Sequence, residues 1–187
     1  LAEPGASRGL VAVSATVLGL YLLSLAVLGL GTLGILNQAI WFVILGMGAA
    51  LLLCIVWKRR KRLGIPKTIH RVHWLWLLAA AAAALVLAGA LVSPGALATP
   101  DEYDVLEYHL QVPREFHNAG EIAPLKHNVY SFYPLGVELL FLLCMILRGG
   151  AYEGMYLAQM IPAVFLGLGV IGIFSGIPVG EIQDPGL

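Results

Sequence analysis

Charged side chains are scarce in this sequence of 187 residues. Only 12% of the residues are Asp, Glu, Lys or Arg, whereas 59% are hydrophobic, and the mean hydropathy is +0.87. Soluble globular domains carry about 25% charged residues. The composition therefore argues against a water-soluble domain and predicts apolar runs long enough to span a membrane.

Cysteine is also rare, and its two positions argue against two kinds of site. Cys54 and Cys144 each lie inside an apolar run. They provide no disulfide framework, and neither belongs to a Cys/His cluster with the spacing of a metal site. We therefore expect both thiols to be small apolar packing residues and predict no metal site.

The few charges are sorted along the chain, although the formal net charge is +0. Seven of the 11 Lys and Arg residues lie between Trp57 and His73, and six of the 11 acids lie between Asp101 and Glu121. The basic cluster directly follows an apolar run. It therefore indicates the cytoplasmic side of a membrane and gives no sign of nucleic acid binding.

Apolar runs predict an all-α, polytopic membrane protein with about five transmembrane helices. The runs cover residues 10–30, 36–57, 73–92, 133–147 and 152–174. The first two are joined by a short turn that contains glycine, so they predict an antiparallel hairpin. The fourth run is short for a full crossing.

The basic cluster sets the expected topology. The N-terminus should be cytoplasmic, the loop at 93–132 extracytoplasmic, and the tail after Ser175 outside. The chain then divides into an N-terminal hairpin with a basic loop (1–72), a second part with one span, the loop and two more spans (73–175), and an irregular tail (176–187). The abrupt end of the helical pattern in this tail suggests that the sequence is a piece of a longer protein.

The extracytoplasmic loop should contain an amphipathic helix over residues 102–118 that lies on the bilayer surface. At 100° per residue, its apolar side includes His109, which we expect to be a packed histidine. Pro113 should kink this helix, and Gly120 should end it. The polar side carries Asp104, Glu107, Tyr108, Gln111, Glu115 and Asn118. Asp104 and Tyr108 can line one cavity because they are four residues apart, although a solvated face is the alternative.

Polar and aromatic residues are dense at 125–140, just before the fourth run. An aromatic belt at the headgroup level explains the tyrosines but not His127, Asn128 or Glu138. Glu138 lies about one turn into the apolar run, where a carboxylate costs about 3 kcal/mol unless it is paired or faces a wet cavity. Glu138 is therefore a candidate functional residue.

The segment 103–140 resembles the first large extracytoplasmic loop of bacterial glycosyltransferase family 39-like membrane proteins. These are relatives of the protein O-mannosyltransferases and the lipid A aminoarabinose transferases, and they have the GT-C fold. The most specific features are Asp-x-x-x-Tyr-His at 104–109 and His-Asn-x-Tyr-Ser-x-x-Pro at 127–134. The resemblance covers about residues 75–175, and residues 1–72 have no counterpart in it.

This resemblance implies an enzyme of the bacterial cytoplasmic (inner) membrane that transfers a sugar from a polyprenyl-phosphate donor to an extracytoplasmic acceptor. Asp104 matches the family's catalytic base. Asp101 is the alternative, because many relatives have Asp-Glu at this point and Asp101-Glu102 offers that pair in another register. No cofactor is expected; a divalent metal assists some relatives, but the sequence shows no ligand set for one.

Other residues of the loop are expected to bind substrate, and three of its basic residues are candidates for the lipid phosphate. The expected substrate-binding residues are Asp101, Glu107, Tyr108, His109, Lys126, His127, Asn128, Tyr130, Ser131 and Glu138. The phosphate candidates are Arg114, Lys126 and His127.

Two further functions stay open. In the first, the chain is a non-catalytic membrane subunit that scaffolds a larger complex through its helices, and its partners are other membrane subunits. In the second and weaker one, it is part of a transporter, although only Glu138 is a convincing intramembrane ionisable group. An enzyme should lose transfer when Asp104 is changed, whereas a scaffold should not.

Overall fold

The computed structural model describes residues 8–59, 74–93 and 104–176. All regular structure within these ranges is helical, as predicted. In chain order the elements are α1 (Arg8–Thr32), α2 (Gln38–Arg59), α3 (Trp74–Gly89), the π-helical turn η2 (Val105–His109), α4 (Gln111–Ala119), the 3₁₀ turn η3 (Val129–Phe132), α5 (Glu138–Arg148), α6 (Ala151–Gln159) and α7 (Ile161–Gly176). Most of the basic cluster and the tail beyond Gly176 lie outside the described residues.

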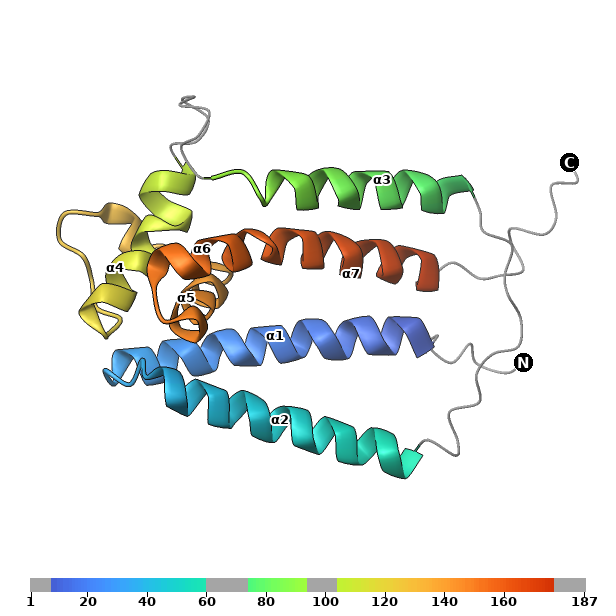
Figure 1. Ribbon diagram of the computed structural model, residues 1–187, viewed down its shortest axis with the longest axis horizontal. Helices are drawn as coiled ribbons and strands as arrows, with labels where there is room; N and C mark the ends of the chain where they lie inside the picture. Colours follow the sequence, from blue (N-terminus) through green and yellow to red (C-terminus); the bar gives the residue numbers. More distant parts are fainter. Residues whose placement is uncertain (1–7, 60–73, 94–103, 177–187) are drawn as a thin grey trace, which may run out of the picture.

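The long helices α1, α2, α3 and α7 extend from one end of the molecule, where the remaining elements gather (Figure 1). We call these remaining elements, residues 104–159, the cap. α1 and α7 are antiparallel, because a Cβ on Gly172 would lie 3.6 Å from Cγ1 of Val13. The segment after α3 reaches the cap, where the hydroxyls of Ser93 and Tyr156 lie 2.8 Å apart.

Among the described residues, three helices are long and apolar enough to cross a membrane: Gly9–Thr32, Gln38–Lys58 and Ala151–Ile173, which joins α6 to α7. They agree with the predicted first, second and fifth spans. Pro162 explains the break between α6 and α7, because its ring crowds the carbonyl four residues earlier. The third predicted span corresponds to α3, whose described length is 16 residues. At a rise of 1.5 Å per residue it measures about 24 Å, less than a hydrocarbon core of about 30 Å.

The fourth predicted span is not confirmed. α5 has only 11 residues, which is about 16 Å of helix. It ends at Gly149, whose φ is 75°, and the chain then turns back into α6, which packs against α5. α7 therefore ends beside the start of α1 (Figure 1). The predicted placement of the two chain ends on opposite faces is not confirmed either.

The core of the cap surrounds α5, whose residues 138–146 are all buried. Four helices contribute to its main cluster, which contains Val27, Trp41, Val112, Phe116, Leu139, Leu142, Leu143 and Ile146. Two hydrogen bonds connect the ends of α5 to the long helices: Ser24 Oγ donates to the Gly136 carbonyl (2.7 Å), and Gln38 Nε2 donates to the Leu147 carbonyl (2.9 Å). Burial of these apolar side chains holds the cap on the ends of α1 and α2.

α4 is the regular part of the predicted amphipathic helix. It buries Val112, Pro113 and Phe116 and packs against α5. It ends at Gly120, which has a φ of 74° and donates its N–H to the Phe116 carbonyl (2.9 Å). The predicted glycine stop is therefore confirmed.

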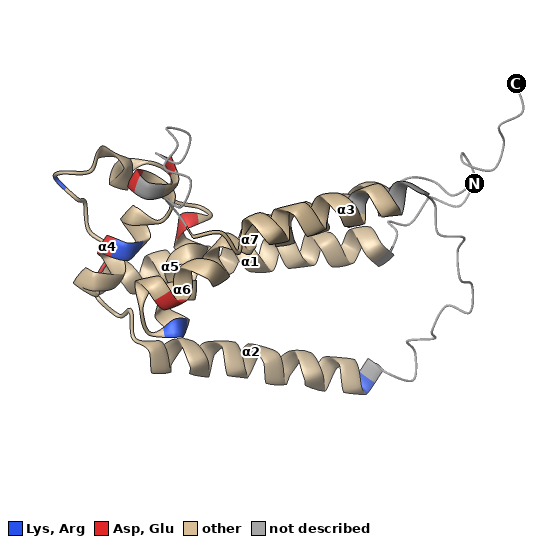
Figure 2. Ribbon diagram, turned by 45° about the horizontal axis from the view of Figure 1, so that its top comes forward, with Lys and Arg blue, Asp and Glu red and all other residues tan. Residues whose placement is uncertain are grey.

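The charged side chains of the described residues are unevenly placed. They lie on the cap and at the far end of α2, whereas the lengths of the long helices carry almost none (Figure 2). Many large apolar side chains on α1 and α2 are exposed. This distribution suits helices that face lipid tails and a cap that reaches the aqueous boundary.

Gly154 allows a direct test of the α5–α6 contact. A Cβ at this position would collide with the backbone of Met145. Gly154→Ala is therefore expected to lower the free energy of unfolding by about 1–3 kcal/mol, measured by thermal unfolding of the purified protein in detergent. Gly169→Ala in α7 is the matched control, because nothing lies within 4 Å of its Cβ position. Equal effects of the two substitutions would contradict the close approach of α5 and α6.

Candidate functional site

The candidate site is built around Glu138, the first residue of α5. Glu138 is 6% exposed, and its Oε1 lies 2.7 Å from Nδ1 of His109, the last residue of η2. A buried carboxylate is costly unless a donor compensates it. The sequence left open whether Glu138 is paired or faces a wet cavity; in the structure it is paired, and the partner is His109.

The environment of His109 differs from the one predicted. The ring is hydrogen-bonded, as expected of a packed histidine, but its side chain is 41% exposed, so it is packed only in part. Because a carboxylate accepts the proton on Nδ1, Glu138 fixes the orientation of the ring. Nε2 is then the nitrogen that can accept a proton or donate one to a ligand.

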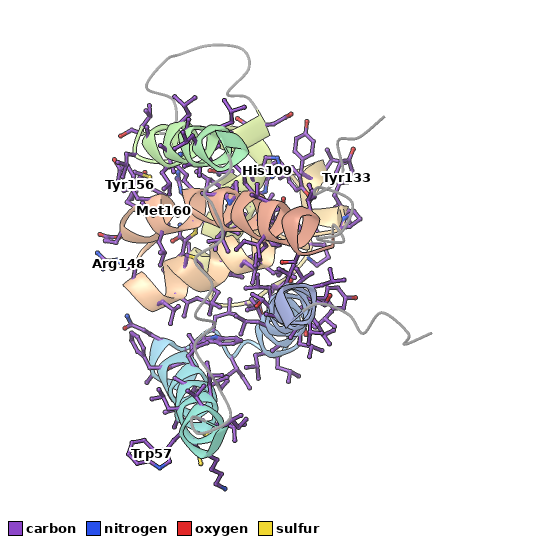
Figure 3. All side chains as sticks on the ribbon, turned by 90° about the vertical axis from the view of Figure 1, so that its right-hand side faces the viewer. Trp57, His109, Tyr133, Arg148, Tyr156 and Met160 are labelled. Atoms are coloured by element: carbon purple, nitrogen blue, oxygen red, sulfur yellow. The ribbon has the colours of Figure 1, made fainter. Side chains whose placement is uncertain are left out.

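Three tyrosines lie next to this pair. The Tyr108 ring centroid is 4.5 Å from that of His109, 5.5 Å from that of Tyr130 and 6.0 Å from that of Tyr133. His109 and Tyr133 lie on the same side of the molecule (Figure 3). The Tyr108 hydroxyl donates to the Pro134 carbonyl (3.2 Å). Together these rings form an aromatic surface with polar tips, which suits a ligand that carries hydroxyl groups.

Glu138 also acts on Tyr108. Burial raises the pKa of Tyr108 above its ordinary value of 10.0, and the negative charge of Glu138 and a hydrogen bond to it raise it further. The phenol therefore stays protonated over the physiological range, and it donates its one proton within the protein, to the Pro134 carbonyl.

The π-helical turn η2 explains why His109 was assigned to the wrong face. The Leu110 N–H donates to the Val105 carbonyl, five residues earlier, at 3.0 Å. In such a turn, residues five apart are about one turn apart. Asp104 and His109 are five residues apart, so they lie about one turn above each other. In a regular α-helix they would be separated by about 140°. Pro113 favours the irregular turn, because its ring crowds the His109 carbonyl. The structure shows this irregular turn just before Pro113, and the kink at Pro113 stays a prediction.

Asn128 and Ser131 hold the loop that follows α4. Asn128 is buried; its Nδ2 donates to the Glu107 carbonyl (2.9 Å), and its Oδ1 accepts the Tyr130 N–H (3.0 Å). Ser131 Oγ accepts the Leu125 N–H (2.9 Å) and donates to the Asn128 carbonyl (2.9 Å). These bonds fix the segment that carries Tyr130, so both residues shape the site.

His127 belongs to a second pair. Its Nε2 lies 2.7 Å from Oε2 of Glu115, and Oε1 of Glu115 accepts a hydrogen bond from Gln111 Nε2 (2.7 Å). Glu115 was expected only to be part of the polar face of the helix. Its spacing of four residues from Gln111 was the available signal for this contact.

The remaining predicted residues are exposed. Within 8–59, 74–93 and 104–176, no side-chain hydrogen bond or ion pair joins Asp104, Glu107 or Lys126 to another residue. Asp104 is thus available to accept a proton from a bound hydroxyl. Asp101 lies outside the described residues.

The described ranges also contain no group of three or more His, Cys, Asp and Glu side chains that could hold a metal ion. The candidate site consists of a carboxylate, an imidazole and phenols. Comparisons with models of protein families, with curated proteins and with solved structures found no match to this chain, so the family resemblance stays a prediction.

Proposed function

We propose that this chain acts in GT-C-type glycosyl transfer, moving a sugar from a polyprenyl-phosphate donor to an acceptor at the extracytoplasmic face of the bacterial cytoplasmic membrane. The observation that supports the proposal is the pair formed by buried Glu138 and half-exposed His109, with the ring of Tyr108 beside it, at the end of helices long enough to cross a membrane. A lipid-linked donor presents its phosphate and sugar at this boundary. The acceptor reaches the same place from the aqueous side.

In the proposed reaction, Asp104 accepts the proton of the acceptor hydroxyl while the hydroxyl oxygen attacks the anomeric carbon of the sugar. The new carbon–oxygen bond forms as the bond from the anomeric carbon to the phosphate oxygen breaks, and the electron pair goes to the phosphate. The lipid phosphate is already a leaving group, so no acid is needed to protonate a glycosidic oxygen, unlike in the two-carboxylate hydrolases. A single displacement inverts the anomeric centre.

His109 and Glu138 act on the phosphate side of this reaction. Glu138 holds Nδ1–H of His109, so a protonated ring presents Nε2–H to the phosphate oxygens as negative charge develops on them. The cluster of Tyr108, Tyr130 and Tyr133 offers an aromatic surface to the sugar. Lys126, exposed on the loop between α4 and η3, adds a positive charge on the aqueous side.

The test of the proposal is sugar transfer in membranes that contain the longest reading frame with this sequence. A panel of polyprenyl-phosphate donors with labelled sugars is supplied, and membranes without the protein are the control. We expect time-dependent transfer to an acceptor only when the protein is present. Correct insertion without transfer from any donor of the panel would reject the proposal.

A non-catalytic scaffold is the second candidate function, and the exposed apolar surface of α2 favours it. Only 6% of the most apolar part of this helix is buried inside the protein, and α2 lies apart from α3 and α7 (Figure 3). Helices of partner subunits can cover such a surface as well as lipid can. A scaffold would bring down the same membrane partners with or without Asp104, which separates it from the enzyme.

A further inference from the structure

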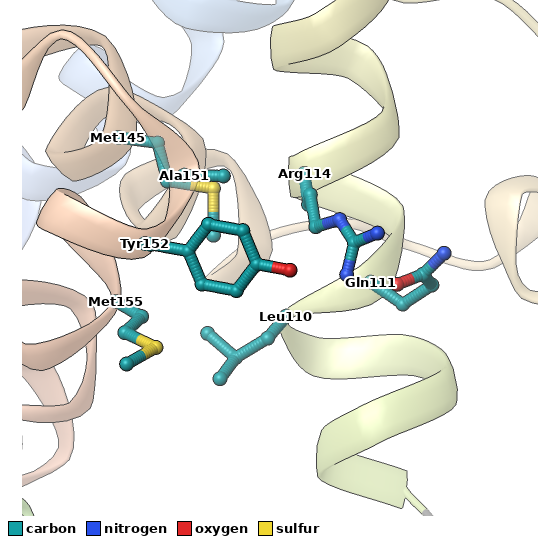
Figure 4. Close-up of a pocket in the computed structure, with 7 residues that line it drawn as sticks. All are labelled: Leu110, Gln111, Arg114, Met145, Ala151, Tyr152 and Met155. Carbon is teal, nitrogen blue, oxygen red and sulfur yellow. The ribbon is translucent and has the colours of Figure 1, made fainter. Parts of the chain in front are cut away.

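A hollow lies between α4 and α6, on a part of the cap that the proposed reaction does not use. Arg114 of α4 and Tyr152 of α6 face each other across it (Figure 4), and the guanidinium carbon of Arg114 is 5.6 Å from the centroid of the Tyr152 ring. This cation–π contact orients the charged group at the wall of the hollow. Four further lining residues are apolar: Leu110, Met145, Ala151 and Met155.

Within the part of the chain that the structure describes, no carboxylate forms an ion pair with Arg114. Both ion pairs of the described residues involve histidines, His109 with Glu138 and His127 with Glu115. Glu115 directly follows Arg114 in sequence, but its two oxygens are bound by Gln111 and His127. A half-buried guanidinium with no ion-pair partner among the described residues suits an anionic ligand, because its planar donors match phosphate oxygens.

The position of the hollow restricts the source of that ligand. Ala151, which lines the hollow, is also the first residue of the candidate span Ala151–Ile173, which joins α6 to α7. The start of a span lies at the level of the lipid headgroups, where tyrosines are frequent. At this level, a phosphate group and the first carbons of a lipid chain meet the protein together.

We propose that this hollow binds the phosphate group of a membrane lipid, with Arg114 as its cationic ligand. The apolar walls contact the adjoining carbons of the lipid chain, and Tyr152 keeps the guanidinium in place. A glycerophospholipid and a polyprenyl phosphate share this chemistry. For a polyprenyl phosphate the inference rests on the proposed function and places Arg114, one of the phosphate candidates, in a defined hollow; for a glycerophospholipid it holds whether or not the protein transfers sugar.

The test is titration of the purified full chain in detergent with paired lipids, followed by native mass spectrometry. Dioleoyl phosphatidic acid is compared with dioleoylglycerol, a polyprenyl monophosphate with the corresponding polyprenol, and inorganic phosphate is added alone. We expect at least one phosphate-bearing lipid to bind, and Arg114→Gln to weaken its binding by about tenfold. Arg114→Lys, which keeps the charge but not the planar donors, should retain part of the affinity. Arg148→Gln is the matched control, because Arg148 is an exposed arginine of the same cap that does not line the hollow.

Each outcome decides the inference. Binding of either phosphate-bearing lipid that depends on Arg114, with weak binding of its partner without phosphate, supports the site and identifies its source. Equal binding of inorganic phosphate would overturn it, because the apolar walls would then contribute nothing. Equal affinity in the wild type and in a folded Arg114→Gln protein would overturn it as well, and thermal unfolding of each variant establishes that it is folded. A wild-type protein that binds the lipid but transfers no sugar would count against the proposed reaction alone.

Discussion

Replacing Asp104 by asparagine is expected to lower sugar transfer by about 10²–10⁴-fold. The amide keeps the size of the side chain but cannot accept the proton of the acceptor hydroxyl at neutral pH. Asp104 is exposed and makes no side-chain hydrogen bond to another described residue. The substitution should therefore leave folding intact, and the loss should appear in the rate of the chemical step. Single-turnover transfer in membranes, at matched protein levels, measures it.

Glu121→Gln is the control for this substitution. Glu121 is an exposed carboxylate of the same loop, directly after the glycine that ends α4, and it takes no part in the proposed reaction. It should transfer at the wild-type rate. Equal transfer by the wild type and Asp104→Asn would remove Asp104 as the base and make Asp101 the next residue to test. A scaffold predicts no transfer in any of these proteins and unchanged partners in all of them.

The sequence predicted the long helices well because composition alone determines them. An apolar run of more than 20 residues that ends in a basic cluster, such as the run that forms α2, has few alternatives to a membrane helix. The sequence predicted α5 poorly, because an apolar run has the same composition whether lipid or other helices surround it. The glycine pair after Arg148 was visible, but its consequence depends on α6 packing back against α5. Contacts between distant segments decide such a case, and hydropathy does not contain them.

The site was predictable where a single residue carries an energetic cost. Glu138 was identified because a carboxylate in an apolar run needs a partner, but the identity of the partner was not, because His109 lies 29 residues earlier. The helical wheel also assumed 100° per residue through a segment that forms a π-helical turn. The hollow between Arg114 and Tyr152 could not be predicted either, because it depends on the turn between α5 and α6.

Glu138→Gln is expected to change the site without removing it. The glutamine oxygen can still accept Nδ1–H of His109, but the hydrogen bond loses its charged acceptor and becomes weaker. We expect transfer to fall by about 100-fold, because the imidazole is then less often held in the productive orientation. Thermal unfolding of the variant is measured together with the rate, because a general loss of packing would lower both.

Tyr108 reports the same substitution independently of catalysis. Part of the rise in its pKa comes from the charge of Glu138, so in Glu138→Gln the pKa of Tyr108 should fall towards 10.0, although burial still holds it above that value. Absorbance of tyrosinate against pH measures the shift, and Tyr108→Phe identifies which transition belongs to this residue.

Because the pKa of Tyr108 is raised in the folded protein, the stability linked to the neutral phenol is fully present below pH 10.0 and is lost as the pH rises through the folded pKa. Thermal unfolding of Glu138→Gln should therefore depend less on alkaline pH than that of the wild type. An unchanged Tyr108 transition would show that Glu138 does not act on the aromatic cluster, and its assignment as the residue that positions His109 would lose its support.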